Sequence, residues 1–321
     1  MSHCIDIICL HRFVYLLNAQ FIPVTYNTMG RSTDTTILPR LGNGKFEVGY
    51  AEIMVSDGEN DDTGILLTIY YPADSTLTYE KSQHPLWLTR KEYIDGVAAY
   101  RNSSTLLLRF INKYIIGKRR IPARQHLALN NTVTSYPVLI FSHGLSGCRN
   151  FYSVYCSSVA SHEIPVKIRK LMPTDDEFQL RNGQLHKRTA ECIETVHLLE
   201  ELNLGQLSSD QQTERKLLLG NDFCGHNSRF PYDYKSRLDT SRIFIAGHSF
   251  GGITAIAAAA VVVLDGWMFP IDKELLTHVR QPVLFMNAEH FQWEANIKDM
   301  LQIMEKSERS VLLTFNGTYG S

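Results

Sequence analysis

Ser249 is the residue of this chain best placed to act as a nucleophile. It stands at the centre of a Gly-x-Ser-x-Gly pattern over residues 247–251, between an apolar run, 243–246, and an alanine-rich segment, 253–260. This order is typical of a tight strand-to-helix turn that exposes the serine hydroxyl, the nucleophile elbow. Both glycines fit such a turn, because it brings backbones too close for side chains. The pattern predicts acyl transfer through Ser249, although an ordinary strand–turn–helix uses the same residue types.

Donors for a developing oxyanion are the second requirement of a serine nucleophile. One donor is the backbone N–H that follows the nucleophile, here that of Phe250, and another comes from the loop after an earlier strand. The continuously apolar run 137–141 predicts that strand, and the loop 142–145 follows it. Leu145 in this loop is the expected second donor.

An acid must orient the general base, and in this chain order it lies between the serine and the base. Two acids follow apolar runs downstream of Ser249. Asp265 comes after the run 261–264, and Glu289 comes shortly after the run 283–286. The residue types and their spacing do not choose between these two acids.

The general base has no obvious candidate. After the last apolar run, 311–315, the sequence reads Asn-Gly-Thr-Tyr-Gly-Ser without a histidine. His278 and His290 follow Ser249 in the chain, but neither is placed like the base of a triad. His143 precedes the serine, and a histidine packed in its loop is the better interpretation of it.

The elements that must position these residues alternate between strands and helices. Phe46–Val55 and Ile65–Tyr71 read as antiparallel strands, and Thr174–Leu204 reads as a long helix with a capping box at its start. The later apolar runs continue the alternation, which favours a mostly parallel sheet with helices on both faces. The predicted fold is an α/β-hydrolase domain over 41–321, preceded by a poorly defined N-terminal extension over 1–40.

Composition excludes several functional classes. The 321 residues are 44% hydrophobic with a formal net charge of −1, a globular balance that favours no nucleic-acid partner. The six cysteines are scattered without zinc-site spacing, so we expect free thiols, a reducing compartment, and neither metal nor cofactor. No apolar run approaches the roughly 20 residues that span a bilayer.

Three segments together resemble the platelet-activating-factor acetylhydrolase family, the calcium-independent phospholipases A2 of the lipoprotein-associated and intracellular type II kind. They are Phe-Ser-His-Gly-Leu over 141–145, Gly-His-Ser-Phe-Gly-Gly over 247–252, and Leu-Asp-Gly-Trp-Met-Phe-Pro over 264–270. The resemblance extends through Tyr-Tyr-Pro at 70–72 and the segment 281–292. It covers the chain from about residue 41 to near its end.

The resemblance implies hydrolysis of the short sn-2 acyl group of platelet-activating factor and of oxidised phospholipids, without a metal. It implies that Asp265 rather than Glu289 is the triad acid, and that Leu145 and Phe250 are the oxyanion donors. The partners it implies are a phospholipid substrate and a phospholipid or lipoprotein surface. We expect a cytoplasmic protein that associates peripherally with membranes, with secretion as the alternative.

One basic amphipathic segment fits a lipid surface. Apolar residues recur there at helical spacing beside arginines and lysines of 101–120, and such a helix can lie on a phospholipid surface. A lid helix packed on the core is the alternative interpretation. The residues expected to face lipid are Leu106, Leu107, Phe110, Tyr114 and Ile115.

Three departures from the family indicate an impaired enzyme. The family places its catalytic histidine in a Gly-x-x-His arrangement after the last strand. In this chain Gly317 corresponds to the glycine of that arrangement, and Gly320 stands in place of the histidine. The chain then stops, so we expect the domain to be truncated at its C-terminus. After 160–166 the sequence passes almost directly into the long helix, which predicts that a strand of the sheet is shortened or missing. The segment between Ser249 and Asp265 is also short and lacks a turn residue.

The sequence also allows two other hypotheses for the function. One is a non-catalytic lipid-binding pseudo-esterase that keeps the pocket and the amphipathic helix. The other is a general acyl esterase of the same fold that uses Glu289 as its acid.

Overall fold

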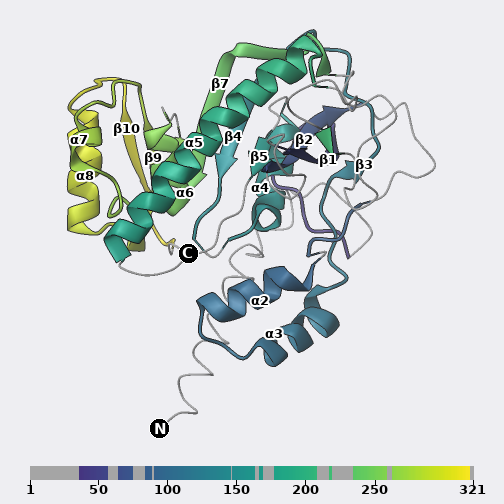
Figure 1. Cartoon of the computed structure of the whole chain (residues 1–321), viewed down its shortest axis with the longest axis horizontal. Coiled ribbons are helices and arrows are strands. Elements are labelled where there is room, and N and C mark those ends of the chain that lie inside the picture. Colours follow the sequence, from purple (N-terminus) through teal and green to yellow (C-terminus); the bar gives the residue numbers. More distant parts are fainter. Residues whose placement is uncertain are drawn as a thin grey trace.

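The computed structural model describes residues 36–56, 64–74, 84–88, 90–145, 147–162, 166–168, 177–207, 217–218, 234–258 and 262–318. Most of the predicted N-terminal extension, 1–40, therefore lies outside the described residues, as does the start of the predicted long helix at Thr174. The structure is shown in Figure 1.

The strands of the described residues form one ten-stranded sheet, in the order β10-β9-β8-β7-β4-β5-β2-β1-β3, with β6 paired to β1. The strands are β1 (Glu47–Ser56), β2 (Gly64–Ala73), β3 (Arg124–Gln125), β4 (Tyr136–Ser142), β5 (Val166–Ile168), β6 (Leu217–Leu218), β7 (Leu238–His248), β8 (Val262–Leu264), β9 (Leu284–Ala288) and β10 (Val311–Phe315).

The antiparallel pair predicted near the start of the domain is β1 and β2, joined in register from Glu47 opposite Ala73 to Ser56 opposite Gly64. The strands β4, β7, β8, β9 and β10 pair in parallel. Parallel strands need covering on both faces, which is why 137–141 reads as a continuous apolar run. The predicted α/β-hydrolase arrangement is confirmed.

Helices lie on both faces of this sheet. They are α2 (Lys91–Tyr100), α3 (Thr105–Ile111), the π-helix η1 (Asn112–Ile116), the 3₁₀ helix η2 (Arg149–Tyr152), α4 (Ser153–Ala160), α5 (Glu177–Leu204), α6 (Phe250–Ala257), α7 (Lys273–Leu276), the 3₁₀ helix η4 (Glu289–Phe291) and α8 (Glu294–Met304).

Two core clusters show how the strands separate their side chains. Val138 and Ile140 of β4 belong to the cluster that contains residues of α5, α6 and α8, whereas Leu139 and Phe141 belong to the one that contains residues of α2 and α4. Successive side chains of a strand point to opposite faces, so β4 contributes to both clusters. In Figure 1, α5 crosses the sheet diagonally, and α2 and α3 project from the body of the domain.

The strand that the sequence predicts to be shortened or missing is present but short. The three residues of β5 pair in parallel with β4 and antiparallel with β2. A strand of this length keeps the sheet continuous between its two halves. The expectation of a missing strand is therefore corrected to a shortened one.

The short connection after the nucleophile is accommodated by short elements. Helix α6 ends at Ala257, where the N–H of Ala258 still donates to the carbonyl of Thr254, and β8 has three residues. The residues between them, 259–261, lie outside the described residues. At the sheet edge, Val311, Leu313 and Phe315 of β10 are 44–47% exposed.

Candidate active site

Ser249 occupies the strained turn that the sequence predicts. It lies between the end of β7 and the start of α6 with φ 55° and ψ −119°. A positive φ is unfavourable for a residue with a Cβ and is kept only where the surroundings enforce it. Here the N–H of Ser249 donates to the carbonyl of Leu264 (2.8 Å), and its carbonyl accepts from the N–H of Gly252 (2.9 Å). The serine is thus held as a nucleophile elbow requires.

Both glycines of the pattern are required by the space around the turn. A Cβ on Gly247 would lie 2.0 Å from the carbonyl oxygen of Gly251, and a Cβ on Gly251 would lie 2.0 Å from that of Ser142. Both atoms belong to the backbone, so neither contact can be relieved by rotating a side chain. The close approach brings β4, β7 and α6 together beneath Ser249.

The loop predicted to hold the oxyanion lies beside the nucleophile. A Cβ built on Gly144 would be 3.4 Å from the Cβ of Ser249. Leu145 follows directly, and its side chain packs against the core cluster beneath the site. Phe250 begins α6, so its N–H has no partner within the helix. The structure therefore places Gly144, the residue before Leu145, beside Ser249, and Phe250 directly follows the serine.

Asp265 lies inside this site, immediately after β8. Its N–H donates to the carbonyl of Met286 (3.0 Å), and its Oδ1 accepts the N–H of Ala288 (2.6 Å). Burial raises the pKa of this carboxyl, and the Ala288 N–H opposes that shift. Its other oxygen, Oδ2, lies 3.9 Å from Nε2 of His248.

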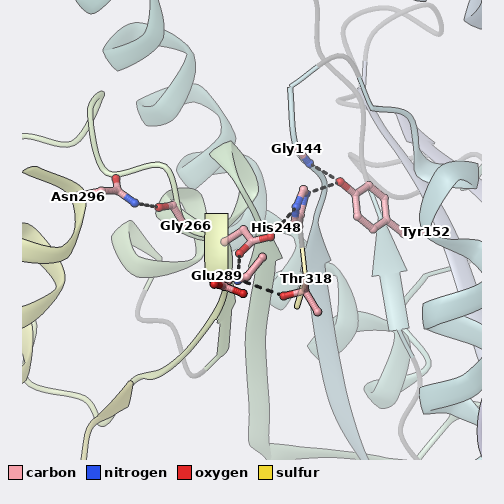
Figure 2. Close-up of polar contacts among 9 residues, drawn as sticks. Gly144, Tyr152, His248, Gly266, Glu289, Asn296 and Thr318 are labelled. Carbon is pink, nitrogen blue, oxygen red and sulfur yellow. Dashed lines mark hydrogen bonds and ion pairs between the residues drawn. The ribbon is translucent and has the colours of Figure 1, made fainter. Parts of the chain in front are cut away.

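Glu289 has a different setting. Its side chain is exposed and accepts the N–H of Gly317 (2.6 Å), while its own N–H donates to Oγ1 of Thr318 (3.4 Å). It thus ties the end of β9 to the turn after β10, as Figure 2 shows. This is the setting of a turn-stabilising side chain.

His143, His278 and His290 were the histidines considered from the sequence, and none of them lies in the position of a general base. His143 is buried, and its Nδ1 lies 2.8 Å from the carbonyl of Gly144. His278 is exposed with Nδ1 at 2.9 Å from the carbonyl of Glu274, and His290 is exposed in η4. The described part of the turn after β10, residues 316–318, contains no histidine. Gly320 lies outside the described residues.

Sequence reasoning missed three residues that the structure brings to the site. His248 ends β7 beside Asp265, and Tyr152 of η2 lies 2.7 Å from its Nδ1. Asn296 of α8 holds the loop after Asp265, because its amide donates to Gly266 and accepts from the N–H of Met268. Figure 2 shows the contact of His248 with Tyr152 and that of Asn296 with Gly266. His248 stood within the elbow pattern, whereas no pattern marked Tyr152 or Asn296.

The helix predicted to face lipid is two elements, α3 and η1. Leu106, Phe110 and Tyr114 are 78%, 60% and 64% exposed, and Leu107 is also exposed. The side chain of Ile115 is outside the described residues. Leu108 and Ile111 face inward and are buried. The apolar residues that the sequence predicted to face lipid, such as Leu106 and Phe110, are therefore open to solvent. The opposite side of the helix packs on α2 and the core.

The imidazole of His248, whose side chain is 15% exposed, should make stability depend on pH. Burial lowers its pKa to about 4. The pKa of histidine in an unfolded chain is about 6.5, so below that pH the unfolded chain binds a proton that the folded chain does not bind. The stability present above about pH 6.5 therefore decreases as the pH falls toward 4. Asp265 acts in the opposite direction, because its raised pKa lets the folded chain bind a proton first.

When the pH falls from about 7 to about 4, the free energy of unfolding should decrease in both proteins. We expect the decrease to be about 3 kcal/mol smaller in His248→Gln than in the unmodified chain. Urea unfolding at a series of pH values measures this difference. Equal pH dependence in both proteins would show that His248 is not held neutral by burial.

The fold and the elbow define the class: an α/β-hydrolase domain with a serine nucleophile elbow. A model of the family described as platelet-activating factor acetylhydrolase, isoform II, matches residues 30–168 and 163–320, and the chain belongs to that family. The two matched segments meet where the shortened strand β5 lies.

Relatives and a solved structure agree with this assignment. The platelet-activating factor acetylhydrolase of Gallus gallus is 29% identical over 86% of this chain and 72% of its own length. That of Canis lupus familiaris is 27% identical over 86% and 66%, and a putative phospholipase A2 of Schizosaccharomyces pombe is 24% identical over 71% and 62%. The chain thus spans about two thirds of the length of these relatives.

A ferulic acid esterase from Streptomyces cinnamoneus has the same fold at a TM-score of 0.52 and 15% identity, covering 84% of this chain and 72% of that one. A likeness at this identity concerns the fold alone. Three described cysteines, Cys148, Cys156 and Cys192, have buried thiols. Among the described residues, no helix is long and apolar enough to cross a membrane.

Proposed function

We propose that the chain is a serine esterase of the platelet-activating factor acetylhydrolase type, a 1-alkyl-2-acetylglycerophosphocholine esterase, whose activity is impaired by the missing base. The observation that carries the proposal is the strained Ser249 between β7 and α6, with the Gly144 loop against it. Family membership supports the substrate class: the short sn-2 acyl ester of platelet-activating factor and of oxidised phospholipids.

The chemistry assigns a role to each group. Ser249 Oγ attacks the sn-2 carbonyl, and the N–H groups of Leu145 and Phe250 stabilise the resulting oxyanion. The lyso-phospholipid leaves, and water hydrolyses the acetyl-enzyme. A base must take the serine proton and return it to the leaving oxygen, and Asp265 is the acid that orients this base. The resemblance to the family puts its base at the position of Gly320, so in this proposal the uncatalysed proton transfer limits the rate.

Asp265 is the better acid of the two, because its carboxylate is half-buried beside the elbow, whereas that of Glu289 caps an exposed turn. If the general-esterase reading held instead, Glu289→Gln would remove activity and Asp265→Asn would not. We place the protein at a phospholipid surface as a peripheral, cytoplasmic protein, with secretion as the alternative. No cofactor or metal is part of the proposal.

The experiment is hydrolysis of an sn-2-acetyl phospholipid and of its sn-2-palmitoyl counterpart, with Ser249→Ala as control. We expect the unmodified chain to hydrolyse the acetyl ester at a rate close to that of the control and to bind vesicles. Fast turnover that persists in Ser249→Ala would dismiss the serine esterase. Fast turnover that the substitution abolishes would mean that a base is present after all.

The exposed stripe of α3 should determine binding to vesicles. Replacing Leu106 or Phe110 with aspartate is expected to weaken partition onto phosphatidylcholine vesicles about tenfold each, because burying such a side chain contributes about 1.5–3 kcal/mol. Sedimentation with vesicles measures this. Leu301→Asp on α8 is the matched control, since that leucine is 47% exposed on another element. Equal losses in all three variants would contradict a specific lipid-facing helix.

A further inference from the structure

Tyr152 and His248 form a bridge directly behind the oxyanion loop. The hydroxyl of Tyr152 accepts the N–H of Gly144 at 3.1 Å and lies 2.7 Å from Nδ1 of His248. A Cβ on Gly144 would meet both Oη of Tyr152 and Nδ1 of His248 at 3.1 Å. The loop that carries Leu145 is therefore packed against the bridge as well as hydrogen-bonded to it. Figure 2 shows the contacts of Gly144 and His248 meeting at the Tyr152 hydroxyl.

The direction of these hydrogen bonds follows from the number of protons. A phenol has one proton, and burial raises the pKa of Tyr152, which keeps that proton in place. Because the oxygen already accepts from Gly144, the proton is available to His248, so Nδ1 is the acceptor. The neutral imidazole then carries its own proton on Nε2, which faces Oδ2 of Asp265 at 3.9 Å. This tautomer is inferred from the network.

The element that carries Tyr152 is firmly anchored. Arg149 at the start of η2 makes a buried ion pair with Glu52 of β1 (2.6 Å). The indole N–H of Trp87 donates to the carbonyl of Asn150 (2.5 Å). The Tyr152 ring also packs on that of Phe141 in β4, with centroids 5.1 Å apart. A hydroxyl fixed in this way can hold a loop in one position.

We propose that Tyr152 and His248 are positioning residues that fix the oxyanion loop through Gly144 and link it to Asp265. This inference rests on the proposed function for its consequence in catalysis, but not for the bridge itself. His248 is not the substitute for the absent base, because its two ring nitrogens are directed at Tyr152 and Asp265. Removing the Tyr152 hydroxyl releases both the loop and Nδ1.

The first test is spectroscopic and needs no substrate. Nitrogen NMR of the chain labelled at histidine is expected to show His248 as the Nε2–H tautomer with Nδ1 accepting a hydrogen bond. Tyr152→Phe should shift the Nδ1 resonance, and Tyr155→Phe should leave it unchanged. Tyr155 is the matched control because its ring contacts Phe141 at the same 5.1 Å. An Nδ1–H tautomer in the unmodified chain overturns the proposal, whether or not the variants fold.

The second test measures the consequence in the chain carrying Gly320→His. Tyr152→Phe should lower kcat about 10²-fold with little change in KM, as expected when one oxyanion donor is displaced. Tyr155→Phe should not change kcat. Equal kcat in Tyr152→Phe and its parent would overturn the positioning role. If Gly320→His has no turnover at all, the proposed function fails, while the NMR result still decides on the bridge.

Discussion

Replacing Gly320 with histidine is expected to raise the hydrolysis of an sn-2-acetyl phospholipid by about 10³-fold or more. In serine hydrolases, loss of the base alone costs up to about 10⁶ in kcat, because the oxyanion donors and substrate binding then act without proton transfer. In the proposed assignment the chain keeps the nucleophile Ser249, the acid Asp265 and the oxyanion donors Leu145 and Phe250. A histidine placed after β10 would restore the remaining group. The release of lyso-phospholipid measures the rate.

The matched control is Ser321→His, which adds the same side chain one residue away from the Gly-x-x-His arrangement. It should give at most a small gain. Gly320→His combined with Ser249→Ala should return the rate to that of the unmodified chain. An equal gain from both histidine positions would contradict the role assigned to residue 320.

Gly251→Ala is expected to unfold the elbow and to lower the free energy of unfolding by more than about 4 kcal/mol. The new Cβ would lie 2.0 Å from the backbone carbonyl of Ser142. Because the first turn of α6 and the end of β4 cannot both move without separating the sheet from its helix, the contact cannot be relieved cheaply. Urea unfolding followed by circular dichroism measures the loss.

The control for this prediction is Gly183→Ala in α5. Nothing lies within 4 Å of a Cβ at that position, and alanine favours a helix over glycine by about 1 kcal/mol. We expect this variant to be as stable as the unmodified chain or slightly more so. Similar losses in Gly183→Ala and Gly251→Ala would show that the elbow is not the cause.

Residue patterns predicted the sheet well, because its strands have clear periods and clear ends. The alternation over 46–55 and 65–71 predicts β1 and β2, and the run 311–315 coincides with β10. Whether β5 is present could not be predicted in this way, because a strand of three residues is too short to show a periodic pattern. Its pairing with β2 and β4 depends on partners that are distant in the sequence.

The site was predicted where a backbone conformation demands particular residues. Ser249 stood out because the positions two residues before and after it must be glycine. Asp265 stood out once the Asp-Gly-Trp-Met-Phe-Pro segment pointed to the family. Tyr152, His248 and Asn296 were not found as a set. Their roles arise from contacts across the fold, such as the 96 residues that separate Tyr152 from His248 in the chain. Such a contact leaves no local pattern.

The measurement that tests the central claim most directly is site-resolved labelling of the chain with a short-chain fluorophosphonate, followed by mass analysis of the peptides. Such a reagent forms a covalent bond with a serine nucleophile that has an oxyanion site beside it. We expect one labelled residue, Ser249, with slow labelling in the unmodified chain and faster labelling in Gly320→His. Labelling of another residue, or labelling that survives Ser249→Ala, would contradict it.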